Sequence, residues 1–284
     1  MLIIAKRNLF VFFRDKSNVL FSFLAVFIIL GLYVMFLGDL MVQGMQDITG
    51  AAFLINSWVM AGIIAVTSVT STLGAFGIMV EDRARKTIKD FTAAPIKRSD
   101  IAGGYIVSVF VIGVIMSLIA LLFAELYIVL RGGELLPLMS LLKVIAIIPL
   151  AVLASSSIVF FITSFISSQN AFTTISTIIG TLIGFLTGIY IPIGSLPEAV
   201  QFVIKVFPVS HAASLLRSIM LERPMDVSFA DAPADAVASF KADMGVHYQF
   251  GEMTTTAAGS VAVLIATTIL FYALSLINIS RKRK

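Results

Sequence analysis

Residues 56–80 read NSWVMAGIIAVTSVTSTLGAFGIMV, and residues 81–100 read EDRARKTIKDFTAAPIKRSD. The first stretch has no charged residue and is long enough to cross the roughly 30 Å of hydrocarbon in a bilayer as a helix. The second stretch holds six basic and four acidic residues, although only 13% of the chain is charged and 59% is hydrophobic. This contrast indicates a membrane-spanning helix that ends in a polar loop.

The chain contains six apolar runs long enough to span a membrane. They cover residues 19–38, 56–80, 103–130, 139–165, 171–193 and 257–279. With a cytoplasmic amino terminus, 14 of the 20 Lys and Arg residues lie on the cytoplasmic side, and most of the acidic residues lie on the outer side. The positive-inside rule therefore predicts a multi-pass protein with both termini cytoplasmic. We expect it in a bacterial plasma membrane.

Residues 1–18 precede the first run and predict an amphipathic helix in the membrane interface. Its predicted apolar face holds Leu2, Ala5, Leu9, Phe12 and Phe13, and its polar face Arg7, Asn8, Arg14 and Asp15. Two roles are open for this helix: a basic anchor that only sets the topology, or a contact with a partner.

The polar loop at 81–100 predicts a short helix of its own. Thr87 and Asp90 have the spacing of a capping box, so a helix is expected to start at Ile88, and Pro95 ends it. Ser99 and Asp100 are then expected to cap the next span.

An apolar tip is predicted on this short helix. Ile88 and Phe91 lie three residues apart and would project toward the cytoplasm or the headgroups, within a rim of charged side chains. An apolar anchor with a charged rim is typical of a protein interface. The alternative is a charged turn that only enforces the topology.

Two motifs resemble those of a known family, the ABC type-2 exporter permeases. The first is the cytoplasmic pattern Glu81-x-Arg83, Thr87, Phe91, Pro95, Arg98, Ile101 and Gly104. The second is Pro192-Ile-Gly-Ser-Leu-Pro197 followed by Phe207-Pro-Val-Ser-His-Ala-Ala-Ser-Leu-Leu-Arg217, which is similar to the family's turn and short outer helices between spans five and six. Lys86 departs from the pattern, because the family usually has glycine before the threonine; this change either alters the helix start or only adds charge.

The resemblance implies an all-α integral membrane protein built as one ABC-2 type transmembrane domain over residues 1–284. It would have six transmembrane helices, an interfacial helix at 1–18, a cytoplasmic coupling loop at 81–100 and an outer segment at 195–256 with short re-entrant helices. It also implies two protein partners, a separate cytoplasmic ABC ATPase and a second permease copy or homologue, within a shell of membrane lipids. The implied ATPase-coupling residues are Glu81, Arg83, Arg85, Thr87, Ile88, Asp90, Phe91, Pro95 and Arg98.

Several kinds of chemistry have no sequence support. The chain has no G-x-x-x-x-G-K-[ST] phosphate loop and no cysteine, and His211 and His247 lack metal-ligand spacing or a nucleophile motif. We therefore expect no catalytic residue, no metal and no cofactor in this chain, with ATP and magnesium bound by the partner ATPase. The basic clusters lack interleaved aromatic residues, so no nucleic acid is expected.

Small and hydroxyl residues recur inside the predicted spans. Gly180, Gly184 and Gly188 at spacing four predict a packing seam on one helix face. Hydroxyl rows in spans two and five either bond their own backbone carbonyls or, as the resemblance implies, flank the substrate route. The candidate pathway residues are Asn56, Thr67, Ser71, Thr173, Thr177 and Thr181.

Charged residues near the outer side leave further alternatives open. Glu125 and Lys143 are predicted at equal depth in a helical hairpin, as a structural ion pair or as groups that recognise cargo. In the outer segment, residues 198–222 are apolar enough to re-enter the membrane, and 231–245 predict a small helix. The polar part is a neutral insertion, a lid or a docking element.

The function we expect is a permease subunit of an ATP-driven exporter. Its substrate would be amphipathic, of a drug-like, lipid or glycan type, and would move out of the cell. The alternatives are a stand-alone secondary transporter or channel, which would need intramembrane charges for ion coupling, and a membrane sensor or scaffold coupled to an ATPase.

Overall fold

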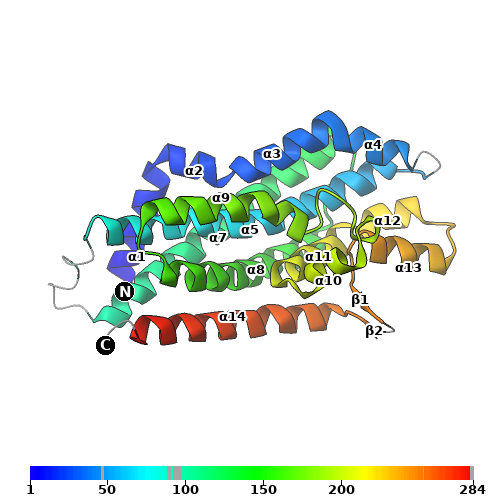
Figure 1. Cartoon of the computed structure of the whole chain (residues 1–284). Coiled ribbons are helices and arrows are strands. Elements are labelled where there is room, and N and C mark those ends of the chain that lie inside the picture. The colour runs from blue at the N-terminus through cyan, green and yellow to red at the C-terminus, as the bar shows by residue number, and fades with distance from the viewer. Residues whose placement is uncertain (46–47, 88–90, 92–96, 252, 282–284) are drawn as a thin grey trace.

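The structure is a computed structural model that describes residues 1–45, 48–87, 91, 97–251 and 253–281. Its helices lie side by side in one elongated bundle (Figure 1). The first helix begins and the last helix ends at the same end of this bundle, which we call the terminal end; the opposite end is the distal end. This arrangement is the one that an even number of spans requires.

Six helices in the described part of the chain are long and apolar enough to cross a membrane, which confirms the predicted all-α membrane fold. They cover Leu24–Gln43, Ala51–Ala84, Ser99–Leu130, Leu138–Phe165, Gln169–Leu186 and Ala257–Asn278. The first span begins at Leu24 rather than at residue 19, because a short helix at Lys16–Ser22 continues the interfacial segment.

The first span is built from three successive pieces, and the other spans are single helices. The pieces of the first span are α3 (Leu24–Leu32), the π-helical turn η1 (Tyr33–Leu37) and α4 (Gly38–Gln43). The single helices are α5 (Ala51–Ala84), α7 (Arg98–Leu130), α8 (Leu138–Phe165), α9 (Gln169–Leu186) and α14 (Ala257–Arg281). Ahead of the spans lie α1 (Leu2–Arg14) and α2 (Lys16–Ser22).

Short elements close the distal end between α9 and α14. They are η2 (Ile193–Ser195), α10 (Glu198–Val206), α11 (Pro208–Met220), α12 (Glu222–Ser228), α13 (Ala234–Asp243) and the hairpin of β1 (Gln249–Phe250) and β2 (Met253–Thr254). Helices α10 and α11 meet at an angle of 86°, which agrees with the predicted re-entrant pair. Helix α13 lies within the predicted range of 231–245, and Gly245 follows it with a φ of 65°.

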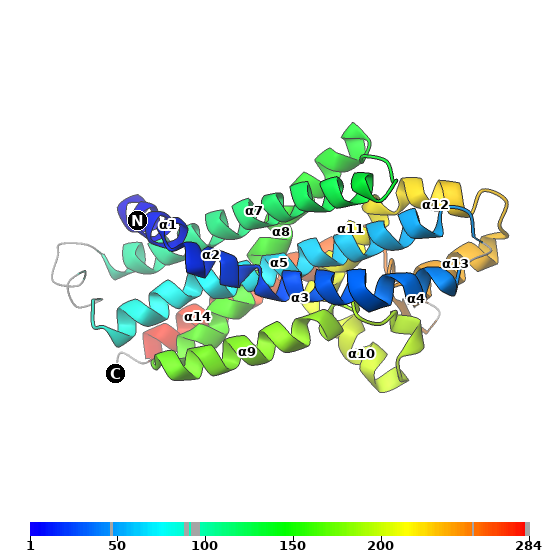
Figure 2. The same cartoon turned by 90° about the horizontal axis from the view of Figure 1, so that it is seen from above.

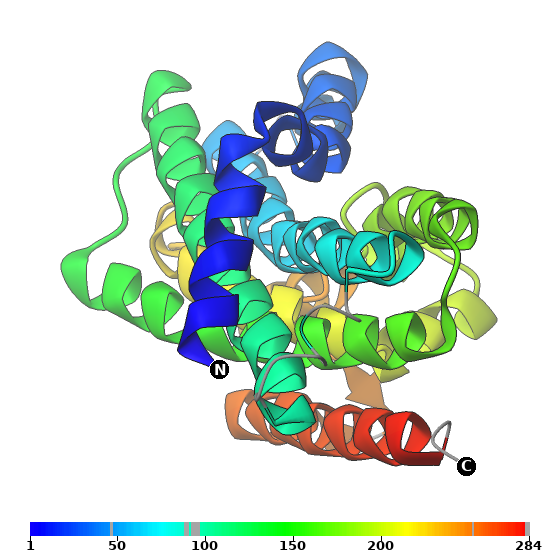
Figure 3. The same ribbon diagram turned by 90° about the vertical axis from the view of Figure 1, so that its left-hand side faces the viewer.

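Helix α5 forms the centre of the bundle. It lies between α7 and α9 and also contacts α8 and α11 (Figure 2, Figure 3). Hydroxyl groups buried in α5 bond carbonyls of their own helix: Thr67 Oγ1 donates to Ile63 O at 2.8 Å and Ser71 Oγ to Thr67 O at 2.6 Å. These bonds agree with the first alternative for the hydroxyl row of span two, and a place beside the substrate route stays a prediction.

The glycines of span five do not form the predicted three-residue seam. Gly188 lies beyond the end of α9 with a φ of 63°, where its N–H donates to Phe185 O and the N–H of Ile189 donates to Gly184 O. This is the hydrogen-bond pattern of a glycine C-cap, so the prediction is wrong for Gly188. Gly184 contacts the ring of Tyr190, and Gly180 has open space where a Cβ would lie.

Arg217 of α11 is fully buried at the distal end. Its Nη2 donates to Thr187 O and Gly188 O, both at 3.1 Å, and its guanidinium carbon lies 4.7 Å from the ring centroid of Trp58. Its Nε and Nη1 have no hydrogen-bond partner among the described residues. Arg217 therefore joins the carboxyl end of α9 to α11 and to the central helix.

The predicted pair of Glu125 and Lys143 is wrong. Lys143 Nζ lies 3.1 Å from Glu222 Oε1, while Glu125 Oε2 accepts a hydrogen bond from the backbone N–H of Leu136 at 2.9 Å. Helix α12 places Glu222 over the hairpin between α7 and α8. Lys143 therefore pairs with Glu222 of α12 instead of Glu125 of α7.

Candidate functional site

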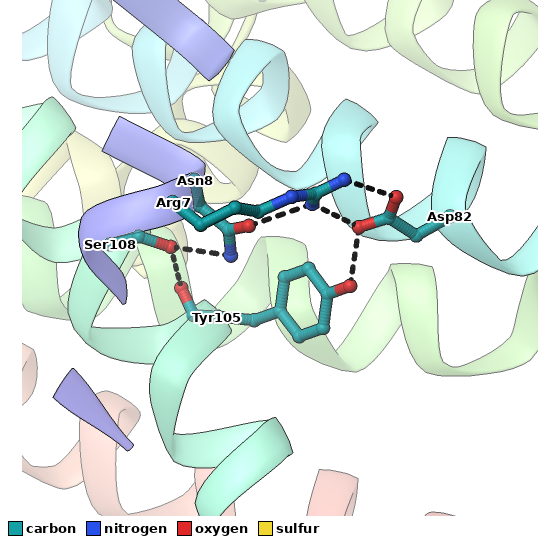
Figure 4. A network of polar contacts seen from close by, with 5 residues as sticks. All are labelled: Arg7, Asn8, Asp82, Tyr105 and Ser108. Atoms are coloured by element: carbon teal, nitrogen blue, oxygen red, sulfur yellow. Dashed lines mark hydrogen bonds and ion pairs between the residues drawn. The ribbon is translucent and has the colours of Figure 1, made fainter. Parts of the chain in front are cut away.

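A buried ion pair joins the interfacial helix to the end of span two. Arg7 of α1 bonds both carboxylate oxygens of Asp82 near the end of α5, Nη1 to Oδ2 at 2.5 Å and Nη2 to Oδ1 at 2.9 Å (Figure 4). The Asp82 side chain is only 7% exposed, and that of Arg7 is 37% exposed. Hydrogen bonding to Asp82 raises the pKa of Arg7 above its ordinary value, so the guanidinium stays charged.

Span three completes this cluster. The hydroxyl of Tyr105 on α7 donates to Asp82 Oδ2 at 2.5 Å. Asn8, next to Arg7, donates from Nδ2 to Ser108 Oγ at 3.3 Å and accepts a bond from Arg7 Nη1 at 2.9 Å (Figure 4). These five residues, Arg7, Asn8, Asp82, Tyr105 and Ser108, are called the clamp below. The clamp locks α1, α5 and α7 together at the terminal end.

The predicted faces of α1 are wrong for Asn8 and Leu2. Asn8, placed on the polar face, is 1% exposed, whereas Leu2, placed on the apolar face, is 72% exposed. Helix α1 packs across α7, and its buried side holds Ile4, Ala5, Asn8 and Phe12. Asn8 is stable there because Ser108 and Arg7 satisfy its amide.

Phe91, in the segment after α5, lies next to the clamp. The Cζ atom of Arg7 lies 5.6 Å from the centroid of the Phe91 ring, and the ring also packs against the main hydrophobic core. Phe91 is half-buried, and its predicted role as an apolar tip toward the cytoplasm or the headgroups stays a prediction. Phe91 therefore touches the arginine that bonds Asp82 of α5.

The other predicted coupling residues are distributed around the clamp. Glu81 pairs with Arg85 at 2.7 Å on the exposed side of α5. Arg83 Nη1 donates to Thr163 O at 3.0 Å and Ile166 O at 3.3 Å, which ties α5 to the end of α8. The carbonyl of Thr87 accepts the N–H of Phe91 at 3.5 Å.

The remaining predictions for this loop have different outcomes. Ile88, Asp90 and Pro95 lie outside the described residues, so the capping box and the start and end of the predicted helix stay predictions. Arg98 is the first residue of α7. Ser99 and Asp100 lie inside the first turn of α7 rather than at its cap, which Lys97 occupies.

Lys86, at the position where the resemblance pattern usually has glycine, has a left-handed backbone conformation. Its φ is 64°, and no other described non-glycine residue has a positive φ. A side chain in this left-handed region costs about 1 kcal/mol more than glycine. Lys86 therefore adopts, after the end of α5, the left-handed conformation that glycine adopts at many helix ends.

We expect Lys86→Gly to stabilise the protein by about 1 kcal/mol, because it relieves this backbone strain. A melting curve of the purified protein measures the change. The matched control is Arg85→Gly, since Arg85 has an ordinary φ of −79° and is expected to lose stability. Equal destabilisation by both substitutions would contradict the assignment.

Asp82 and Tyr105 were not identified as site residues from the sequence. A usable signal was present for Asp82, because it follows the buried residues Met79 and Ile78 by three and four positions and therefore lies on the buried face of α5. A carboxylate on a buried face requires a partner. The identity of that partner, 75 positions earlier in the chain, had no local signal.

The predicted pathway residues separate into two groups. Thr173, Thr177 and Thr181 of α9 line a groove of about 1150 Å³ that α2, α3, η1 and α5 also border. Their hydroxyls bond carbonyls one turn earlier, so the groove wall is largely methyl and aromatic. The other group, Asn56, Thr67 and Ser71, is buried in the interior of the chain and does not line this groove.

No metal-binding group forms among the described side chains, since no three His, Cys, Asp or Glu residues cluster there. His211 is held by Ser260 Oγ at 3.1 Å and Lys205 O at 3.0 Å. Burial and the nearby Lys241 lower the pKa of His247, which favours its neutral form.

Six apolar spans, an N-terminal helix clamped to spans two and three, and a bent helix pair at the distal end define an all-α, multi-pass membrane protein. The chain belongs to the ABC-2 type transporter family, whose model matches residues 1–221. It is therefore a transmembrane permease component of an ABC-type transporter. No curated protein matches the chain.

Proposed function

We propose that two copies of this chain, or one copy and a homologue, form the membrane part of an exporter that a separate cytoplasmic ATPase drives. The terminal end faces the cytoplasm of a bacterial cell in this proposal, as the distribution of basic residues favours. The partner ATPase binds ATP and magnesium, and the substrate is amphipathic. Family membership supports the need for an ATPase, and the groove beside α9 supports the class of substrate.

The observation that carries the proposal is the contact between Phe91 and the clamp. Phe91 belongs to the loop that the family resemblance implies for ATPase docking, and it touches Arg7, which bonds Asp82. Closure of two ATPases on ATP binding would move this loop. The clamp would transmit that movement to α1, α5 and α7 together, shifting the bundle between inward-open and outward-open states.

The proposal is tested by purifying the tagged full-length chain from its native membranes. We expect an ATP-hydrolysing polypeptide to co-purify, and transport of an amphipathic dye into inverted vesicles to require ATP and to persist when ion gradients are dissipated. Transport that follows an ion gradient without ATP would indicate a secondary transporter. ATP hydrolysis in a complex that transports no substrate of this class would indicate a sensor or scaffold.

Phe91→Ala is expected to lower the amount of co-purifying ATPase at least tenfold, since central aromatic anchors contribute about 2 kcal/mol or more to an interface. The amount of chain in the membrane should stay normal, because Phe91 is only half-buried. The matched control is Phe10→Ala, which removes another aromatic ring at the terminal end, 58% exposed and outside the clamp. Normal co-purification with the Phe91 variant would contradict the proposed docking role.

A further inference from the structure

The first span is interrupted by a π-helical turn near its distal end. In this turn, η1, the Tyr33 hydroxyl points inward and donates to Asn56 Oδ1 of α5 at 2.9 Å. Gly38 follows immediately, and a Cβ there would lie 2.9 Å from the carbonyl oxygen of Tyr33 and 3.2 Å from its ring. Single π-turns in membrane and soluble helices are frequent at functional sites, because they re-aim a side chain.

A small pocket opens beside this turn. Its volume is about 180 Å³, and it lies between α4, the first turns of α5 and the end of α7. Five of the residues that line it are polar: Tyr33, Asp39, Gln43, Asn56 and Arg131. The pocket lies at the distal end, where three spans leave the apolar part of the bundle.

Two opposite charges border this pocket without neutralising each other. Asp39 comes from α4 and Arg131 from the end of α7, and neither forms an ion pair within 4.0 Å in the described structure. Other exposed charges at the same end do pair, as Arg223 does with Glu134 at 3.1 Å. The pocket therefore offers a carboxylate and a guanidinium to one ligand.

Lipid-facing surface adjoins both charges. Leu40 follows Asp39 and is 63% exposed, and Leu130 precedes Arg131 and is 74% exposed. In a helix that spans a bilayer, such side chains contact acyl chains. A ligand with a polar head in the pocket and apolar tails along these leucines would satisfy both surfaces.

We propose that the pocket bordered by Asp39 and Arg131 binds the headgroup of a zwitterionic phospholipid from the leaflet at the distal end. The phosphate lies on Arg131, whose planar guanidinium suits phosphate oxygens, and the ammonium lies on Asp39. The lipid holds the π-turn of span one against α5 and α7. This binding site is separate from the groove beside α9 and does not depend on the direction of transport.

The test uses the full-length protein in detergent and counts retained lipids by native mass spectrometry. The two probes are phosphatidylethanolamine and phosphatidylglycerol with identical acyl chains, because only the first carries an ammonium group. We expect the protein to retain phosphatidylethanolamine more strongly. Arg131→Gln should weaken retention of both lipids about tenfold, as expected when one charged hydrogen bond is lost, whereas Asp39→Asn should abolish only the preference for phosphatidylethanolamine.

Both substitutions should leave the fold intact, since Asp39 and Arg131 are exposed and unpaired in the described structure. The matched control is Arg223→Gln, an exposed arginine at the same end that should have no effect on retention. Equal retention by the protein and its Arg131 variant, or an unchanged preference in the Asp39 variant, would overturn the proposal. Competition by free phosphoethanolamine at the same concentration as the lipid would overturn the lipid as the ligand.

Discussion

Asp82→Ala is expected to destabilise the protein by about 3 kcal/mol. The substitution removes the acceptor for two Arg7 nitrogens and for the Tyr105 hydroxyl, and it leaves the hydroxyl buried without a partner. The cost stays below the upper range for a buried ion pair because Arg7 is 37% exposed and can regain water. A melting curve of the purified full-length protein, with and without substitution, measures this change.

The neighbouring carboxylate provides the control for this prediction. Glu81 is also ion-paired near the end of α5, but its partner Arg85 is 74% exposed and the Glu81 side chain is 44% exposed. Glu81→Ala should therefore cost less than about 1 kcal/mol. If the two alanine variants melted at the same temperature, the clamp would be no more than a surface ion pair. Our account of force transmission would then lose its structural basis.

Arg217→Ala is expected to have the largest effect on stability, about 4 kcal/mol. It empties the space of a fully buried side chain, removes the cation–π contact with Trp58 and leaves the carbonyls of Thr187 and Gly188 without their donor. Relief of the partly unsatisfied guanidinium offsets some of this cost. The measurement is the same melting curve, read together with the yield of folded protein in the membrane.

Arg217→Met separates the contributions of volume and charge. Methionine fills much of the space but cannot donate to the carbonyls at the end of α9, so an intermediate loss is expected. Arg223→Ala is the matched control, since that arginine is half exposed and pairs only with Glu134 at the surface. A loss below about 1 kcal/mol for Arg217→Ala would show that the arginine does not join α9 to α11 as described.

The spans could be predicted from the sequence because each is decided locally, by the apolar character of about twenty residues. The small helix α13 was equally local, marked by Gly245 after its end, whereas the short outer helices were implied by the family resemblance. The burial of Asn8 could not be predicted, since it depends on Ser108, a residue of another helix. A helical wheel assigns asparagine to the polar side regardless of such a partner.

Pairings between helices were the weakest part of the prediction for the same reason. Glu125 and Lys143 are at similar depth in adjacent helices, yet the lysine pairs with Glu222, because α12 folds over the hairpin. The clamp was missed although Arg7, Asn8 and Asp82 all lie in segments that the sequence analysis considered. Depth in the membrane can be read from one helix, whereas the angle at which two helices face each other depends on the packing of the whole bundle.

The central claim is that the loop after α5 meets an ATPase. A photoreactive phenylalanine analogue at Arg85, whose side chain is 74% exposed beside the clamp, tests it most directly in native membranes. Leu135 at the distal end, 65% exposed, is the control position. We predict an adduct with an ATP-binding polypeptide from position 85 and none from position 135. Adducts confined to this chain and lipid at position 85, or the same ATPase adduct from both positions, would contradict the account.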